Sequence, residues 1–261
     1  MRIASWGHAA FAAVLIALGL QGLITGQLTA LWQPIPKWAQ AGSGLGYFCG
    51  FISLSSGAGL LFRRTAAPAA RTLLGLLLAW CAVFRLPPIL HAPAALLSWY
   101  GLAEPAVMVA ATWVLYAWFA DDWDRKHLGF AIGERAIRGA RVTYGLCLIP
   151  FGIAHFTFIQ RTAGMVPGWL PAHMFWAMFF GGTFIAAGAG IVLGVLARLA
   201  ASLSAFQIGL FNVLVWLPTL AAGTRNPYDW VEAATSVAIM AGGWVVADSY
   251  RDVPWNAVGR R

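Results

Sequence analysis

Polar side chains that could do chemistry are few in this sequence, and most lie near the ends of long apolar segments. Only 10% of the 261 residues are charged, against about a quarter in soluble domains. A charge inside a bilayer costs free energy, so each ionisable group within an apolar segment is a candidate functional residue. The candidates are Arg85, His91, Glu104, His155, His173, Asp229 and Glu232, together with the amide of Asn212.

His155 and Glu232 are the residues that we expect to carry any catalysis. A shift of 133 residues lays His155 on Gly22, on the helix face that Gly19, Gly22 and Gly26 mark, so we expect His155 to face the interior of a helix bundle. It is a buried histidine bonded to a neighbouring helix, a proton-transfer group, or a metal or haem ligand. Glu232 is either stabilised at a helix N-terminus or paired with His155. The same alternatives hold for Glu104, with Arg85 as its partner.

The polar residues gather toward one end of the apolar segments, so a pocket there is expected to open to that side of a membrane. Its predicted lining is Asn212, Trp169, His173, Asp229, Arg85 and Glu104. His155 and His173 have no recognised metal-ligand spacing, and we predict no metal site. The sequence has three cysteines and no CxxC motif, which argues against thioredoxin-like exchange.

The elements that position these residues are apolar segments of membrane-spanning length. The chain is 60% hydrophobic and its mean hydropathy is +0.72, which excludes a soluble globular protein. A membrane helix needs roughly 20 mostly apolar residues. We therefore predict an all-α membrane protein with eight transmembrane helices, at about 9–31, 44–62, 72–91, 102–120, 142–160, 174–196, 202–220 and 231–248.

The basic residues predict the orientation of the chain. In the eight-span arrangement, 13 of the 17 lysines and arginines fall on one side. The positive-inside rule places that side, with both termini and the 121–141 segment, in the cytoplasm. We expect a multi-pass protein of a bacterial inner membrane whose main partner is the lipid bilayer. Because the charges are scattered over short loops, nucleic acid is not an expected partner.

The sequence contains an internal repeat. A shift of 131 residues lays Leu86-Pro87 on Leu217-Pro218, Trp99 on Trp230 and Trp113 on Trp244, and a shift of 133 lays Gly19 on Gly152. We predict two four-helix bundles of the same orientation, related by an axis along the membrane normal. The predicted units are 1–120, a cytoplasmic connector at 121–141, a second unit at 142–250 and a cytoplasmic tail at 251–261.

The second unit resembles the DoxX-like membrane family. The resemblance rests on the run Gly152-Ile-Ala-His155-Phe156, on the loop Val166-Pro167-Gly168-Trp169-Leu170-Pro171 and on Gly181-Gly182. Glu232 and Ala247-Asp248-Ser249 fit that family's fourth span. The resemblance implies a four-helix unit of the inner membrane, and some family members are quinone-linked subunits of thiosulfate oxidation. The fusion of two units and the unpaired cysteines depart from the family pattern.

Three functions follow as hypotheses. The first is a redox-associated, quinone-linked subunit in which His155 exchanges a proton with the quinone and Glu232 relays it. Its cofactor would be a quinone, with haem a weaker alternative, and its partners would be other membrane or periplasmic redox subunits. The second is an intramembrane enzyme acting on a lipid-like substrate. The third is a non-catalytic scaffold that binds partners through GxxxG faces, such as Gly22 with Gly26 and Gly46 with Gly50.

Overall fold

The computed structural model describes residues 3–33, 35 and 44–259, and these residues are mostly helical. The helices of the first half are α1 (Trp6–Thr25), α2 (Gly44–Leu60), α3 (Ala66–Trp80), α4 (Leu86–His91) and α5 (Leu96–Phe119). Those of the second half are α7 (Gly133–Thr157), α8 (Ile159–Gly164), α9 (His173–Leu193), α10 (Ala197–Phe211), α11 (Leu217–Ala221) and α12 (Pro227–Asp248). The short helix α6 (Asp122–His127) lies between the halves.

The chain is an integral, multi-pass membrane protein. Within the described residues, six helical segments are long and apolar enough to cross a bilayer, namely Trp6–Thr25, Ala66–His91, Leu96–Phe119, His173–Leu193, Ala197–Ala221 and Pro227–Asp248. Two further long helices lie beside them. Helix α2 has 17 residues, and α7 begins with turns that carry Glu134 and several arginines. The prediction of an all-α membrane protein is confirmed, whereas crossings by α2 and α7 stay predictions.

The two halves have the same order of elements. Helices α3 and α10 have 15 residues each, and both continue into five-residue π-helical turns, Cys81–Arg85 and Asn212–Trp216. These turns precede Pro87 and Pro218, whose rings have no N–H and crowd the carbonyl four residues earlier, so the helix widens there. The corresponding bounds differ by the 131 residues at which the sequence also matches itself.

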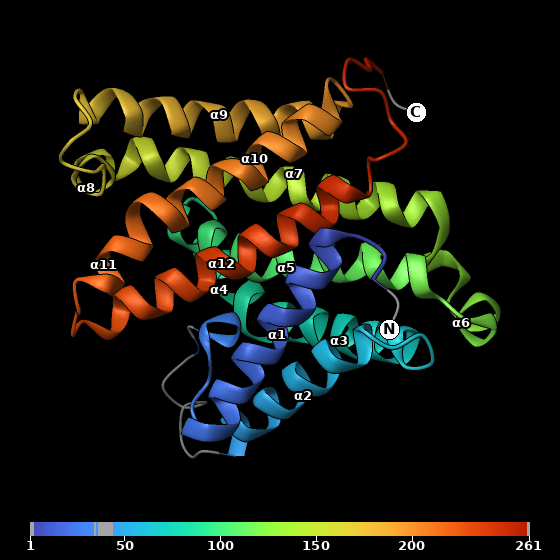
Figure 1. Cartoon of the computed structure of the whole chain (residues 1–261). Coiled ribbons are helices and arrows are strands. Elements are labelled where there is room, and N and C mark those ends of the chain that lie inside the picture. Colours follow the sequence, from blue (N-terminus) through green and yellow to red (C-terminus); the bar gives the residue numbers. More distant parts are fainter. Residues whose placement is uncertain (1–2, 34, 36–43, 260–261) are drawn as a thin grey trace.

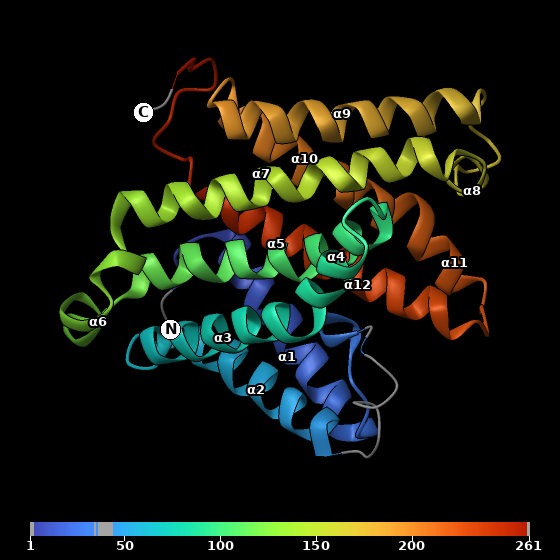
Figure 2. The ribbon, with the colours of Figure 1, turned by 180° about the vertical axis from the view of Figure 1, so that it is seen from behind.

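The packing joins the halves more closely than two separate bundles would. Helix α1 packs against α2 and against α12 of the other half, while α7 packs against α9 and against α5 of the other half. Helices α5 and α12 also contact each other, and the buried apolar residues of both halves form one core. The last helix of each half, α5 or α12, therefore packs against the first helix of the other half (Figures 1 and 2).

The glycine pairs of the first half pack α1 against α2. A Cβ on Gly50 would lie 2.9 Å from the backbone nitrogen of Leu23 and 3.0 Å from the carbonyl carbon of Gly22. A Cβ on Gly46 would overlap the backbone of Gly26. Such close backbone contact is what small residues permit in membrane bundles. These faces are therefore used inside the chain, which removes them as the partner surface of a scaffold.

Both ends of the described chain lie at the same end of the helix bundle as α6, and α8 and α11 lie at the opposite end (Figures 1 and 2). The placement of this end in the cytoplasm stays a prediction. Four of the basic residues used to predict the orientation, Arg2, Lys37, Arg260 and Arg261, lie outside the described residues.

The segment between the halves is fixed by a buried carboxylate. Asp124 on α6 is fully buried and accepts hydrogen bonds from the Tyr116 hydroxyl (2.8 Å), the Asp121 amide (3.1 Å) and the Arg71 guanidinium (2.6 Å). Burial alone would raise the pKa of this carboxyl, but the hydrogen bonds and the Arg71 charge outweigh it and hold the pKa below its usual value. A charged Asp124 therefore ties the segment to α3 and α5.

Candidate functional site

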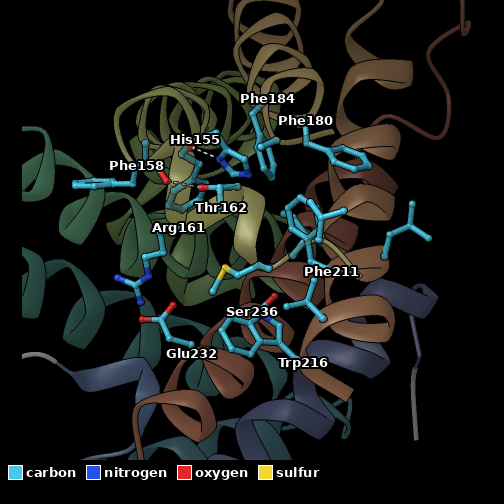
Figure 3. A pocket seen from close by; sticks show the side chains of 18 of the residues that line it. His155, Phe158, Arg161, Thr162, Phe180, Phe184, Phe211, Trp216, Glu232 and Ser236 are labelled. Carbon is cyan, nitrogen blue, oxygen red and sulfur yellow. Dashed lines mark hydrogen bonds between the residues drawn. The ribbon is translucent and has the colours of Figure 1, made fainter. Parts of the chain in front are cut away.

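A cavity of about 380 Å³ lies among helices α5, α7, α9, α10 and α12, at the end of the bundle where α8 lies (Figure 3). Aromatic rings form much of its wall, including Phe151, Trp176, Phe180, Phe184, Phe211 and Trp216. Its polar or ionisable groups include His155, Glu104, Glu232, Arg161, Tyr100 and Tyr228. An apolar cavity with a few converging polar groups is the usual form of a small-molecule site.

The imidazole of His155 is held in one tautomer. Its Nδ1 lies 2.8 Å from the carbonyl oxygen of Phe151, one turn earlier on α7. A carbonyl oxygen only accepts hydrogen bonds, so Nδ1 carries the proton and Nε2 of the neutral ring is an acceptor. The ring stacks on Phe211 at 5.9 Å between centroids and lies 5.4 Å from Phe184. His155 is therefore bonded to its own helix instead of a neighbouring one.

Two glycines, Gly152 on α7 and Gly181 on α9, allow the two helices to pack closely beside His155. A Cβ on Gly181 would lie 2.7 Å from the Cβ of His155, and a Cβ on Gly152 would lie 2.6 Å from the carbonyl oxygen of Gly181. Both distances are shorter than any ordinary contact between heavy atoms. The Gly-x-x-His spacing and the glycine of α9 are therefore parts of one helix contact that fixes the histidine at the cavity wall.

Carboxylates from both halves reach the same cavity. Glu232 comes from α12 and Glu104 from α5, and they lie close enough for their charges to interact. The Arg161 guanidinium on α8 points toward the Glu232 carboxylate in Figure 3. It also lies 5.0 Å from the ring centroid of Tyr228. This cluster places acidic, basic and phenolic groups beside the aromatic wall.

The two glutamates lie deeper in their helices than the apolar segments suggested. Helix α5 begins at Leu96 and α12 at Pro227, so Glu104 is in the third turn and Glu232 in the second. Asp229 occupies the first turn of α12, where its carboxylate accepts hydrogen bonds from Thr224 (2.6 Å) and Asn226 (3.2 Å). The role at a helix start therefore falls to Asp229.

The other predicted lining residues are not among the described residues that line the cavity. Asn212 lies in the second π-helical turn, and its amide donates to the Ile208 carbonyl (3.1 Å) and to the Met240 sulfur (3.7 Å). Arg85 is buried and donates to the Gln33 carbonyl, with no ion pair to Glu104 within the described residues. His173 is the first residue of α9, and Trp169 is 72% exposed.

The repeat offsets match two residues of the cavity wall to tryptophans of the first half. With the repeat offsets, Gly22 corresponds to His155, Trp32 to the lining residue Met165, and Trp80 to Phe211. Trp32 is fully buried, donates from its indole nitrogen to the Ser53 hydroxyl (3.0 Å) and meets Trp80 edge-on at 5.0 Å. Trp32 and Trp80 thus pack against each other in the first half, whereas Met165 and Phe211 line the cavity in the second.

Sequence reasoning missed Arg161, Tyr100 and Tyr228. A signal for Arg161 was present, because it is one of few basic residues expected on its side of the membrane. No group of three or more His, Cys, Asp or Glu residues in the described part of the chain is arranged to hold a metal ion.

Comparisons with protein-family models, with curated proteins and with solved structures find no match for this chain. The resemblance to the DoxX-like family therefore rests on the sequence motifs alone.

Proposed function

We propose that this chain is a DoxX-like protein of a bacterial inner membrane, with two repeated units and both termini in the cytoplasm. Its cavity then opens toward the periplasm and binds the ring of a membrane quinone in its reduced, quinol form. The sequence motifs around His155 and Trp169 support the family. The matching π-helical turns, 131 residues apart, support the repeat.

The observation that carries this proposal is the Nε2 of His155, which lies in an aromatic cavity and has no hydrogen-bond partner within the described residues. Nδ1–H is donated to Phe151, so the neutral imidazole offers a hydrogen-bond acceptor to its ligand. A quinol hydroxyl is a donor, whereas a quinone carbonyl is an acceptor, so this tautomer selects the reduced ring. The Phe211 and Phe184 rings beside the imidazole supply stacking surface for a flat ligand.

The cavity also offers a path for the released proton. Oxidation of a quinol to a quinone releases two protons and two electrons. His155 Nε2 takes a hydroxyl proton as a general base, and Glu232, in the cluster with Arg161 and Tyr228, relays it toward the loop side. The two electrons pass to a redox subunit that associates with this chain. The second hydroxyl proton leaves to the carboxylate of Glu104, which lines the same cavity.

A second candidate function is an intramembrane enzyme that acts on a lipid-like substrate by acid and base catalysis. The specific observation in its favour is the presence of two carboxylates and an imidazole in one apolar cavity. In this reading Glu104 or Glu232 is the acid and His155 the base. The substrate would be isomerised or cyclised without a change in oxidation state, which separates this candidate from the first.

The experiment compares quinol binding by wild type, His155→Phe and His173→Phe in a mild detergent. Quenching of tryptophan fluorescence reports binding, because Trp176 and Trp216 line the cavity. Phenylalanine keeps the ring and removes the acceptor, and His173 lies outside the lining. We expect His155→Phe to weaken quinol binding about tenfold, as loss of one buried hydrogen bond implies, and His173→Phe to leave it unchanged. Equal affinity in all three proteins would contradict the assignment.

A further inference from the structure

A second cavity, of about 200 Å³, lies at the opposite end of the bundle. Its wall combines the apolar side chains of Val142, Ile191, Val192 and Ala197 with Arg138, Arg141 and Tyr250. The volume is several times the roughly 30 Å³ that one water molecule occupies in the liquid. This cavity shares no lining residue with the first one, so it is separate from the quinol site, although its place on the cytoplasmic side rests on the orientation given under the proposed function.

The segment after α12 forms one wall of this cavity. Arg141 donates to the Ser249 hydroxyl (2.9 Å) and to the Ser249 carbonyl, and Arg198 donates to the Val253 carbonyl (2.8 Å). The backbone of Leu196 then donates to the Ala257 carbonyl (2.9 Å). Residues 249–259 are thereby laid along the α9–α10 junction, where Figure 1 shows the red end of the chain. These hydrogen bonds hold the segment in place as part of the cavity wall.

The charge of this cavity is unbalanced. The guanidinium of Arg138 has no hydrogen bond or ion pair within residues 3–33, 35 and 44–259. Arg141 donates a hydrogen bond to Ser249, and its guanidinium carbon lies 4.0 Å from the centroid of the Tyr250 ring. It has no carboxylate within ion-pair distance in the same residues. Glu134 is near enough for its charge to interact with Arg141. Two arginines thus face a small space to which the described residues contribute no carboxylate.

We propose that this cavity binds the phosphate of an anionic phospholipid, with Arg138 and Arg141 holding the phosphate and the apolar wall contacting the glycerol backbone and the start of an acyl chain. The location favours this ligand, because the cavity lies at the end of the helices where the chain gathers its basic residues. Basic pockets between helices on the cytoplasmic side are the usual sites for such headgroups. Arginine also matches the geometry of a phosphate better than lysine does.

The test measures the thermal unfolding of the full-length protein in a neutral detergent. Phosphatidylglycerol, phosphatidylcholine or inorganic phosphate is added in separate series. The variant is Arg138→Gln, since that side chain holds no other part of the structure in place. The matched control is Arg135→Gln, which removes the same charge from the same helix outside the cavity.

We expect phosphatidylglycerol to stabilise wild type and Arg135→Gln equally, and more than phosphatidylcholine does. Arg138→Gln should need about fivefold more phosphatidylglycerol for the same shift, as expected for one basic contact near a membrane surface. Equal stabilisation by the two lipids, or an equal loss in Arg135→Gln, would overturn the proposal. If inorganic phosphate alone gave the full effect, a free anion would be the ligand and the lipid assignment would be wrong.

Discussion

The close contact of α7 and α9 at Gly181 allows a prediction with an internal control. A Cβ at Gly181 would lie 2.7 Å from the Cβ of His155 and 3.0 Å from the Cε2 of Phe156, whereas nothing lies within 4 Å of a Cβ at Gly182. Carbon atoms in contact prefer about 3.5–4.0 Å. Gly181→Ala therefore forces the helices apart by several tenths of an ångström or more, and Gly182→Ala does not.

The expected magnitudes follow from these distances. Overpacking of this kind costs about 1–3 kcal/mol, and replacing a helical glycine with alanine returns up to about 1 kcal/mol. Gly181→Ala should thus lose up to about 2 kcal/mol of unfolding free energy, while Gly182→Ala should be neutral or slightly stabilised. The difference between the two variants isolates the overpacking cost, because both gain the same helix propensity.

The assay is reversible denaturant unfolding of both variants in mixed micelles, followed by helical circular dichroism. Quinol binding is measured on the same samples. Gly181→Ala moves the Cβ of His155, so its affinity should fall, whereas Gly182→Ala should bind as wild type does. Equal stability and equal affinity of the two variants would refute the claim that Gly181 seats His155.

Two further predictions concern the first half and the segment between the halves. Trp32→Ala should cost about 3–5 kcal/mol of unfolding free energy, because it removes a fully buried indole and its hydrogen bond to Ser53. Trp169→Ala, at a side chain that is 72% exposed, should change stability by less than about 0.5 kcal/mol. Unfolding midpoints of the two variants check this, and similar costs would contradict it. The pKa of Asp124 is held below its usual value by bonds that include the one from Arg71, so its stabilisation is full above about pH 4 and is lost as the pH falls through the lowered pKa. Asp124→Asn should flatten the acid side of the stability profile, and an unchanged profile would show that the buried ion pair does not contribute.

Composition and periodicity were enough to predict much of the helical architecture. The long apolar segments and the Leu-Pro pairs marked the helices and the offset between the halves, because the bilayer requires such lengths and a proline inside a helix disturbs it. The sequence also pointed to His155 and Glu232, which the fold brings to one cavity. An ionisable group in an apolar segment is costly, so it is easily recognised.

The helix starts and the shared packing could not be predicted in the same way. Helix α7 begins at Gly133 instead of near 142, since its first turns are charged and give no hydropathy signal. Glu104 reaches the cavity because α5 packs against α7 of the other half, and an internal repeat does not reveal which half a helix will contact. Arg161 and Trp32 lie in short helical segments between the long helices, where no periodic pattern indicates direction.

The central claim is that His155 presents Nε2 to a quinol in the aromatic cavity. The most direct measurement is the total content of quinol and quinone in solvent extracts from protein purified in a mild detergent, for wild type, His155→Phe and His173→Phe, with an absorption spectrum of each. We predict a quinone that co-purifies with wild type, is retained by His173→Phe and is lost from His155→Phe. A quinone-free wild type, or a quinone content that His155→Phe leaves unchanged, would contradict the account.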